Sequence, residues 1–585
     1  MPRMETVATK LRFPLNVYAA LMQATAEQSA FLAYGTLQAR SNSTSPGADE
    51  LIDAQRQLAD QIIAALDLPA GSRVLEVGSG SGLLARHMAD AGWQVTAVDN
   101  NEAASKLSTQ ALSDVSANIV TAEFASQWPQ WAPQQYDALI FHNSARYFLP
   151  LSCFAAARHL LAEGGKVLIV DEFLTGVSDD LKSCDLAQLE NVEALAARAG
   201  FLLQDRVDTS GETANFLDAF IALFQDHRQE LLALTDESPE TISELETAML
   251  DDLKRLRQGD TSHQLLTWQM QAAAESLVPA ETLQAEDFQQ VFERSFKTDF
   301  SAALWHWKYG AGRGASVAAL RDQQVVAHYG GIRRDILYFG DPGTAVQICD
   351  VMVMPEQRSF FSRDSLFFKT ASTMLEQYAG YHARHLLGFG FPNMKAMHVA
   401  QRLKLYDKTD ELVQLKIPVA QHQTDWHLQF GDMDAAVIES AQSLWLAMKE
   451  SFTDSIIGVR DSQYLDYRFR QRPGLDYESV QLIDGDTVVA LIVLRPHGEH
   501  YLIMDILCES ALLGRVFNEI SAHTQRQGRP AVFWLSAGQV DRLGMEAVCV
   551  ESLGIHIPCN RWTRGPSADQ LQGAWWLTAG DMDFM

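Results

Sequence analysis

Short apolar runs alternate with amphipathic stretches along the first 270 residues of the chain. The apolar runs are rich in β-branched residues and predict buried strands at residues 73–78, 94–99, 117–123, 136–143 and 166–173. The stretches between them, such as residues 83–92 and 153–165, predict amphipathic helices. This alternation is typical of a mostly parallel sheet with right-handed crossovers and helices on both faces.

One helix and two strands are predicted to complete this sheet, at residues 190–200, 202–209 and 264–271. The insertion at residues 214–259 separates the last two strands and carries two helical patterns. It is acidic and contains no glycine before Gly259. We therefore expect this insertion to form a helical cap over a site rather than a loop.

The order of elements changes after a boundary near residues 272–286. A helix is followed by a predicted hairpin at residues 316–340, with its turn at Asp322-Gln323-Gln324. Strands are then predicted at residues 345–354, 385–391 and 412–419, and helices at residues 365–380 and 394–405. This pattern favours an α+β domain.

The same order recurs after a second boundary near residues 420–426. Helices are predicted at residues 435–451, 512–527 and 541–552, a hairpin at 477–495, and strands at 501–508, 531–537 and 554–559. Two short sequence echoes accompany it: Trp307-Lys308-Tyr309 with Tyr467-Arg468-Phe469, and Val325-Val326-Ala327 with Val488-Val489-Ala490. The matching order favours duplication. We predict one α/β domain at residues 1–275 and two related α+β domains at residues 280–420 and 425–585.

The net charge of the chain makes some classes of binding partner unexpected. Its 585 residues include 46 basic and 74 acidic side chains, for a formal net charge of −28. Nucleic acids and anionic membranes both favour a surplus of Lys and Arg, so neither is an expected partner. No apolar run approaches the roughly 18–20 residues of a membrane-spanning helix, and no signal peptide is evident. The six cysteines form no CxxC pair, so no metal site is predicted. The sequence thus predicts a cytoplasmic, multidomain enzyme and indicates no oligomeric state.

A glycine-rich turn follows the first predicted strand and opens a helix: Val74-Leu75-Glu76-Val77-Gly78-Ser79-Gly80-Ser81-Gly82. Glycines let the backbone turn tightly and let a ligand lie against the main chain. Leu83 occupies the position where a dinucleotide motif needs its third glycine. A carboxylate at Glu76 would repel a pyrophosphate but attract an ammonium, and Asp99 is placed to accept hydrogen bonds from ribose. The pattern therefore favours S-adenosylmethionine (SAM) over NAD, with an empty glycine turn as the alternative.

These residues resemble the class I SAM-dependent methyltransferases over roughly residues 13–271. The resemblance implies a Rossmann-like, seven-stranded sheet whose last strand is antiparallel, with SAM across the carboxyl ends of the first strands. It also implies a lid at residues 31–35, an adenine contact at Glu123-Phe124 and a methyl-facing segment at Asn143-Ser144. The implied cofactor-binding residues are Tyr34, Glu76, Gly78, Ser79, Gly80, Gly82, Asp99, Asn100, Glu123, Phe124, Asn143 and Ser144.

Candidate catalytic residues lie near the end of the fourth predicted strand. Methyl transfer depends mainly on positioning and desolvation, and needs a base only when the acceptor must lose a proton early. His142 is the candidate base, and Tyr147 and the pair Asp171-Glu172 are candidates to orient an acceptor. A structural, hydrogen-bonded role for His142 is the alternative. No Asn/Asp-Pro-Pro-Tyr motif follows this strand, which disfavours methylation of bases in nucleic acid and favours a small molecule.

The middle domain resembles the GNAT acyltransferase superfamily over roughly residues 283–419, with a fainter copy at residues 428–562. A strand there ends in Met352-Val353-Met354-Pro355 and leads into Arg358 and Arg363, which flank a helix start that favours anions. The resemblance implies acetyl-CoA or another acyl-CoA in a splayed cleft between the fourth and fifth strands. The implied binding residues are Val353, Arg358, Arg363 and Asn393.

The middle domain departs from that family at two places. Phe360 and Phe361 replace the glycine approach of the family's pyrophosphate loop. Val399 and Ala400 occupy the region of the family's general-acid Tyr, so Tyr406 is only a substitute candidate. We expect the last domain to be a structural copy. The aromatic cluster at residues 305–309 is interpreted as core packing, with an acceptor pocket as the alternative.

Two functional hypotheses follow. The first is a bifunctional enzyme that transfers a methyl group from SAM and an acyl group from CoA to a small molecule. The second is a methyltransferase alone, whose tandem GNAT-like region only binds a ligand or supports assembly.

Overall fold

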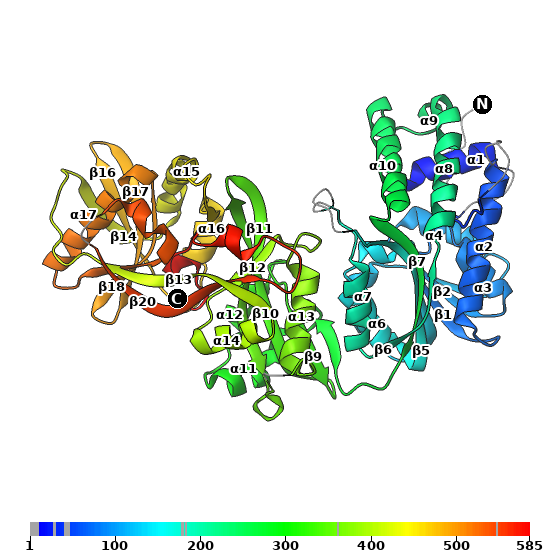
Figure 1. Cartoon of the computed structure of the whole chain (residues 1–585), viewed down its shortest axis with the longest axis horizontal. Coiled ribbons are helices and arrows are strands. Elements are labelled where there is room, and N and C mark those ends of the chain that lie inside the picture. The colour runs from blue at the N-terminus through cyan, green and yellow to red at the C-terminus, as the bar shows by residue number, and fades with distance from the viewer. Residues whose placement is uncertain are drawn as a thin grey trace. The chain divides into compact units, whose positions relative to one another are not determined.

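The computed structural model describes residues 11–26, 31–39, 47–176, 181, 184–359, 362–545 and 548–585. The chain divides into two compact units, Met1–Val278 and Pro279–Met585, which are called unit 1 and unit 2 below (Figure 1). No helix among the described residues is long and apolar enough to cross a membrane.

Unit 1 is built on one seven-stranded sheet in the order β3-β2-β1-β4-β5-β7-β6. Its strands are β1 (Arg73–Val77), β2 (Gln94–Asp99), β3 (Ala117–Thr121), β4 (Tyr136–His142), β5 (Leu161–Leu174), β6 (Phe201–Asp208) and β7 (Thr261–Met270). Strands β1 to β5 pair in parallel, whereas β7 runs antiparallel to both β5 and β6. The predicted seven-stranded sheet with an antiparallel last strand is therefore confirmed.

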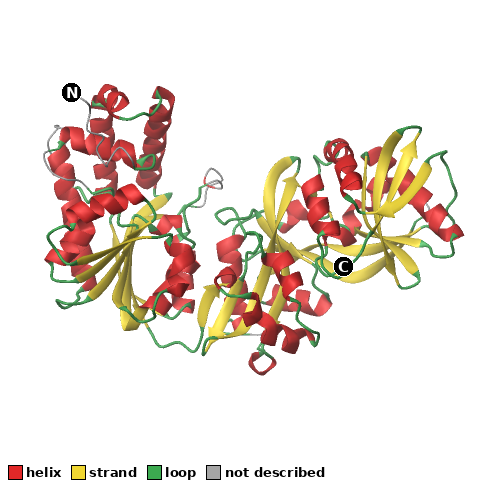
Figure 2. Cartoon of the chain, turned by 180° about the vertical axis from the view of Figure 1, so that it is seen from behind, coloured by secondary structure: helices red, strands yellow, loops and turns green. Residues whose placement is uncertain are grey.

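Helices cover both faces of this sheet (Figure 2). They are α1 (Leu15–Thr25), α2 (Ala48–Leu66), α3 (Leu83–Asp90), α4 (Glu102–Ala111), α5 (Phe124–Gln127), α6 (Pro150–Leu160), α7 (Leu189–Arg198), α8 (Ser210–Asp226), α9 (Arg228–Leu234) and α10 (Pro239–Gln258). On one face, apolar residues of β1, β4 and β5 pack against α2 and α3 in a core that includes Leu58, Ile62 and Leu168. Apolar strands covered on both faces are the reason that the runs in the sequence do not alternate.

The insertion between β6 and β7 forms three helices rather than the two predicted. Helix α10 begins where the hydroxyl of Ser238 accepts a hydrogen bond from the N–H of Thr241, and it ends at Gly259, whose φ is +76°. Helices α8 to α10 pack with α1 and α2 through one apolar cluster that includes Val17, Leu217 and Phe224. Figure 1 shows α8, α9 and α10 gathered at the end of the sheet where β7 begins. The insertion is thus helical, as predicted, and lies at the carboxyl ends of the parallel strands.

Unit 2 contains two further seven-stranded sheets. After β8 (Ser276–Pro279), which spans the boundary between the two units, its elements up to residue 416 are α11 (Gln289–Phe296), α12 (Ala302–Tyr309), β9 (Val317–Arg321), β10 (Gln324–Tyr338), β11 (Asp341–Val353), α13 (Leu366–Tyr378), β12 (Leu387–Gly390), α14 (Met394–Arg402) and β13 (Tyr406–Lys416). The predicted turn of the first hairpin is present, with positive φ at Asp322 and Gln323. Trp305 and Trp307 on α12 are buried, which agrees with core packing of that aromatic cluster.

The remaining elements repeat much of that order. They are β14 (His427–Asp432), α15 (Ala435–Lys449), β15 (Ile456–Gly458), α16 (Ser462–Leu465), β16 (Glu478–Asp484), β17 (Thr487–His497), β18 (His500–Cys508), α17 (Leu513–Arg526), β19 (Ala531–Ser536), β20 (Cys549–Asn560), α18 (Ala568–Leu571) and β21 (Trp575–Trp576). The residues of the sequence echo meet: the rings of Trp307 and Tyr467 stack at 4.9 Å, and the indole N–H donates to the carbonyl oxygen of Tyr467. The contact between equivalent positions is consistent with duplication.

The prediction of a helix at residues 541–552 is wrong. A short 3-10 helix, Ala537–Leu543, ends before Gly544, whose φ is +60°, and β20 begins at Cys549. There Val550 pairs with Leu415 of β13. Backbone pairing with a strand more than 130 residues away in sequence decided the conformation of this segment, and its local pattern did not reveal it.

The two sheets of unit 2 exchange strands. Strand β13 pairs with β19 and β20 in the sheet of the later residues. In return, β15 pairs with β10, and β21 pairs with β15, in the sheet of the earlier residues. Each sheet is therefore completed by chain from the other half of unit 2.

Candidate functional site

The glycine turn after β1 has the backbone that only glycine adopts readily. Gly78, Gly80 and Gly82 have φ of +76°, +54° and +75°. A Cβ on Gly78 would lie 2.6 Å from Cβ of Ser144, and one on Gly82 would lie 2.6 Å from Cα of Ser108. The N–H groups of Gly78 and Ser79 both donate to the carbonyl oxygen of Val98. The turn is therefore packed tightly between the ends of β2 and β4 and the helix α4.

Two carboxylates lie at this turn. Glu76 is 2% exposed, its second oxygen, Oε2, has no hydrogen-bond partner among the described residues, and the backbone N–H of Ala85 donates to the carboxylate. Burial and then the charge of Asp99 raise the pKa of Glu76 well above its ordinary value. Asp99 accepts from the backbone N–H groups of Gly80 (3.0 Å) and Asn101 (2.9 Å), so its carboxylate is fixed at the mouth of the turn.

The predicted adenine-contact residues follow β2 and β3. The side chain of Asn100 donates to Oε2 of Glu123 at 2.7 Å, and both residues are exposed. Phe124 is buried, with its ring edge-on to Trp131, Phe141 and Phe148 at 5.7–6.1 Å. Asn100 and Glu123 thus come together at the surface, while Phe124 packs behind them.

The end of β4 brings three predicted residues together. Asn143 adopts φ of +52°, and the hydroxyl of Ser144 donates to the carbonyl oxygen of Val77 at 2.5 Å. His142 is buried, and burial lowers its pKa to about 4, so its ring is neutral near pH 7. The alternative of a hydrogen-bonded structural histidine finds no support at Nε2, which has no partner among the described residues.

Two residues beside this strand end, Arg146 and His263, were missed by sequence reasoning. Arg146 contacts the carboxylate of Asp171 at 2.6 Å and lies 3.8 Å from that of Glu172. His263 is the register partner of Glu172 across β5 and β7, and Nδ1 of its ring lies 2.7 Å from the hydroxyl of Thr209. Burial, Arg146 and His142 lower the pKa of His263 to about 3. No local motif marks His263, because the antiparallel pairing of β7 brings it to the site.

The predicted lid segment is anchored rather than free. The side chain of Gln55 on α2 is hydrogen-bonded to the backbone of both Phe31 and Ala33. The Cβ of Leu32 lies 3.6 Å from where a Cβ of Gly80 would be, so this segment covers the glycine turn. The ring of Tyr34 lies 5.9 Å from that of His263. Tyr147, in contrast, is 74% exposed.

A scan of protein families identifies this region. Residues 51–201 match the family model of a methyltransferase domain. Unit 1 thus contains a methyltransferase domain, whose matched residues include the glycine turn, Asp99 and the end of β4.

Solved structures similar to this chain include three with low sequence identity. The match to the cyclase SpnF has 17% sequence identity and a TM-score of 0.38, and it covers 44% of this chain and 93% of the SpnF chain. The cyclopropane synthase MmaA2 from Mycobacterium tuberculosis is 17% identical and covers 45% and 96%, with a TM-score of 0.37. Geranyl diphosphate C-methyltransferase from Streptomyces coelicolor is 14% identical and covers 41% and 91%, with a TM-score of 0.33. Curated protein sequences give no match.

The predicted acyl-CoA residues of unit 2 have mostly internal partners. Arg358 donates to the carbonyl oxygen of buried Val353 at 3.0 Å, and Arg363 lies over the rings of Phe368 and Trp562 at 5.7 and 5.5 Å. Asn393 is the exposed N-cap of α14. Phe360 and Phe361 lie outside the described residues.

Tyr406 is buried. Its hydroxyl is hydrogen-bonded to that of Tyr329 at 3.2 Å, and burial raises its pKa well above the ordinary value. A tyrosine in this environment holds its proton firmly. It could act as a general acid only if a substrate reached the buried Tyr329–Tyr406 pair.

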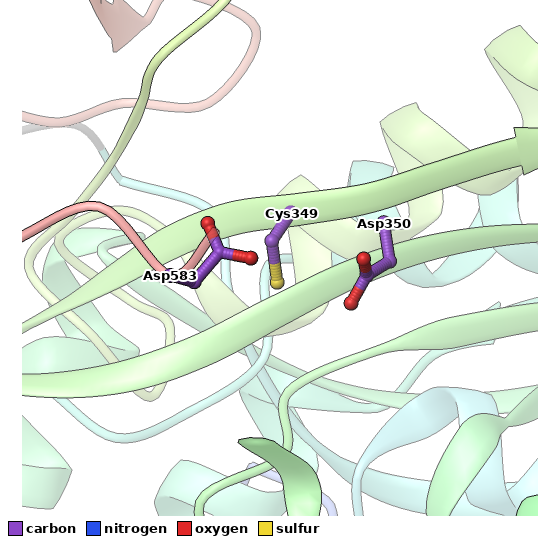
Figure 3. A group of neighbouring side chains, drawn as sticks. All are labelled: Cys349, Asp350 and Asp583. Atoms are coloured by element: carbon purple, nitrogen blue, oxygen red, sulfur yellow. The ribbon is translucent and has the colours of Figure 1, made fainter. Parts of the chain in front are cut away.

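A buried ionic cluster lies beside β11 (Figure 3). The side chains of Cys349, Asp350 and Asp583 gather there, the last from the C-terminal tail. Nζ of Lys308 lies 2.9 Å from Asp350 and 2.6 Å from Asp583. Burial alone would lower the pKa of Lys308, but the two carboxylates raise it above its ordinary value. The ammonium of Lys308 already pairs with both carboxylates, and a metal ion would have to displace it.

Proposed function

We propose that unit 1 transfers a methyl group from SAM to a small molecule. The buried carboxylate of Glu76 carries this proposal. Its unpartnered oxygen lies behind three positive-φ glycines, beside a second acid, Asp99. An ammonium group would give the unpartnered oxygen of Glu76 a donor, and ribose hydroxyls would donate hydrogen bonds to Asp99. A dinucleotide would instead bring negatively charged phosphates to two carboxylates. The residues present therefore fit SAM.

The chain's own residues supply binding and exclusion of water. SAM, when bound, supplies an electrophilic methyl group on a sulfonium. Glu76 would hold its ammonium group and Asp99 its ribose, and the methyl group would face Asn143 and Ser144. The segment with Leu32 and Tyr34 covers the turn. Because His142 and His263 are neutral near pH 7, neither adds positive charge beside a sulfonium. The net charge of −28 supports a small-molecule acceptor over nucleic acid.

Calorimetry with adenosylhomocysteine tests this function. We expect binding by the whole chain, weakened about tenfold or more by Glu76→Gln and by Asp99→Asn. Glu163→Gln, at an exposed position of β5, is the matched control and is expected to bind as the unchanged protein does. Binding of NAD in place of adenosylhomocysteine would falsify the proposal.

Unit 2 has a second candidate function, acyl transfer from acyl-CoA, favoured by its strand geometry. The parallel strands β11 and β12 pair only at residues 345–348 with 387–390, and β11 then continues to Val353 without β12. A bulge interrupts the pairing of β11 with β10 near Asp350, whose φ is +45°. Strands β18 and β19 also pair in parallel over only three residues. The end of β12 at Gly390, short of the end of β11, and the short pairing of β18 with β19 support the predicted splayed cleft and thus a GNAT-like fold.

Calorimetry of the whole chain with acetyl-CoA separates the bifunctional hypothesis from a methyltransferase with a non-catalytic second unit. We expect Arg363→Ala to weaken binding severalfold, and Arg470→Ala, at an exposed arginine far along the chain, to leave it unchanged. If millimolar acetyl-CoA gives no binding, the acyl-transfer hypothesis fails and the non-catalytic alternative for unit 2 is retained.

A further inference from the structure

Among the residues that the structure describes, the charged side chains beneath the helical insertion of unit 1 include three carboxylates and two guanidiniums. The group comprises the carboxylates of Asp171, Glu172 and Asp252 and the guanidiniums of Arg146 and Arg255. Arg146 binds Asp171 through its side chain, and its backbone N–H also donates to Asp171 at 3.0 Å. Arg255 pairs with Asp252. The carboxylate of Glu172 lies farther from Arg146, at 3.8 Å, its Oε1 has no hydrogen-bond partner among the described residues, and Thr261 and Arg255 also favour its charged form.

Glu172 and Asp171 point to opposite faces of the sheet, because neighbouring residues of a strand alternate. Glu172 shares its face with His263, its register partner on β7, and with His142, whose register partner Val170 lies two residues earlier on β5. Glu172 is 3% exposed, and burial raises its pKa. A buried, weakly paired carboxylate is unfavourable unless a cation or a proton completes it.

Aromatic rings lie beside this carboxylate. Tyr34 lies 6.4 Å from Phe216 of α8, Phe216 stacks with Phe220 at 6.3 Å, and Phe220 meets Tyr18 edge-on at 5.3 Å. The ring of Tyr34 also lies 5.9 Å from that of His263, the register partner of Glu172. Burial raises the pKa of Tyr34, and the carboxylates of Asp252 and Glu172 add to that rise. Ring faces next to a carboxylate attract an organic cation.

Two further polar atoms on this side of the strand ends are buried without partners among the described residues. They are Nε2 of His142 and Oδ1 of Asn143. Buried polar atoms normally have a hydrogen-bond partner, so each needs an explanation. The amide oxygen can only accept, and a neutral imidazole has one nitrogen that accepts. A ligand with several N–H donors would satisfy them.

We propose that this site, formed by Glu172, Tyr34, Phe216, His142 and Asn143, binds the methyl acceptor as an organic ammonium. The proposal rests on the methyltransferase function proposed above and names its substrate class. An ammonium neutralises Glu172, packs against the rings and brings donors to the two unpartnered atoms. A neutral alcohol would leave Glu172 uncompensated, and a carboxylate would add a second negative charge.

The transfer balances as follows. The bound ammonium releases one proton to water, and the freed lone pair on nitrogen forms the new N–C bond. The C–S bond breaks with its electron pair left on sulfur, which turns the sulfonium into a neutral thioether. The products are a methylammonium, adenosylhomocysteine and one proton.

Three probes with one skeleton test the proposal: 2-phenylethylamine, 2-phenylethanol and 3-phenylpropionate. Each is titrated calorimetrically into the whole chain saturated with adenosylhomocysteine. We expect the amine to bind about tenfold or more tightly than the alcohol, and the carboxylate not to bind. Glu172→Gln is expected to remove the preference for the amine, whereas Glu190→Gln, an exposed acid of α7, leaves it unchanged.

The outcomes separate the two proposals. Failure of adenosylhomocysteine to bind the unchanged protein overturns the methyltransferase function itself. If adenosylhomocysteine binds but the alcohol binds as tightly as the amine, or the amine does not bind at millimolar concentration, only the ammonium site is overturned. Adenosylhomocysteine binding by Glu172→Gln checks that this variant is folded, and the comparison of the three probes with the unchanged protein needs no variant.

Discussion

The glycine turn of unit 1 keeps its shape because glycine has no side chain to clash with its neighbours. Gly82 has φ of +75°, and a Cβ there would overlap the backbone of Ser108 on α4. Gly71 also has a positive φ, +85°, but a Cβ there would meet nothing within 4 Å. These two positions share backbone strain and differ in crowding, so they separate the two effects.

We predict that Gly82→Ala lowers the free energy of unfolding by about 2–3 kcal/mol and abolishes adenosylhomocysteine binding, because α4 must move away from the turn. Gly71→Ala should cost only about 1 kcal/mol, the strain of a positive φ alone, and keep binding. Urea unfolding and calorimetry measure both effects. Equal losses for the two variants would show that crowding at Ser108 is unimportant.

Because two histidines of unit 1 are buried, we predict that its stability falls in acid. Burial lowers the pKa of His142 to about 4 and helps to lower that of His263 to about 3, against an ordinary value of about 6.5. Between these values the unfolded chain binds more protons than the folded one, so stability falls as the pH falls. From pH 6.5 to pH 5 we expect a loss of about 2 kcal/mol for each histidine.

Hydrogen exchange of peptides from β4 and β7 at the two pH values measures this loss. His142→Gln should remove about half of the pH dependence, whereas His87→Gln, on the partly exposed surface of α3, should leave it largely intact. Protection that is independent of pH in the unchanged protein would contradict the prediction.

At the scale of elements, the C-terminal tail holds unit 2 together through buried ion pairs. Asp581 contacts Arg334 of β10 at 2.8 Å and Arg460 at 2.6 Å, and Arg460 also contacts Asp505 of β18. Arg468 donates to carbonyl oxygens of Gly580, Met582 and Met585. These residues are buried, so removing one charge leaves its partners uncompensated.

We predict that Asp581→Asn lowers the free energy of unfolding of unit 2 by about 3–5 kcal/mol, because Arg334 and Arg460 lose a shared carboxylate inside the protein. Asp541→Asn, at an exposed position, should change it by less than about 0.5 kcal/mol. Thermal unfolding followed by circular dichroism measures the difference. A loss no larger than that of the control would mean that the tail contributes little.

For the whole molecule, the exchange of strands decides where the chain can be divided. Strand β13 belongs to the sheet of β19 and β20, although it precedes residue 420, and β15 and β21 belong to the sheet of β10, although they follow residue 425. The two predicted α+β domains are therefore not independent in their backbone hydrogen bonding. Among the described residues, no strand before the loop between β7 and β8 pairs with a strand after it.

We predict that a cut at residues 273–274 yields two soluble fragments with cooperative thermal transitions, whereas a fragment of residues 280–420 does not fold. Its β13 would expose an unpaired edge, and its sheet would lack β8, β15 and β21. Circular dichroism and limited proteolysis check both statements. A well-folded fragment of residues 280–420 would show that the exchanged strands are dispensable.

The sequence by itself determined the features that depend on local chemistry. The apolar runs defined the strands of unit 1. The glycines with Glu76 and Asp99 defined the predicted cofactor turn, because a few neighbouring residues are enough to set its backbone conformation and its charge. The family match of residues 51–201 agrees with that prediction. His142, Asn143 and Ser144 followed from the same strand pattern.

Only the tertiary structure decided the features that join distant segments. His263 reaches the site because β7 runs antiparallel to β5, and Arg146 reaches it because it binds Asp171. Phe216 reaches it because α8 packs against the segment with Tyr34. Residues 549–552 form a strand, not a helix, because β13 offers a partner for their backbone. Contacts of this kind depend on which strands and helices meet in space, and no local sequence pattern carries that information.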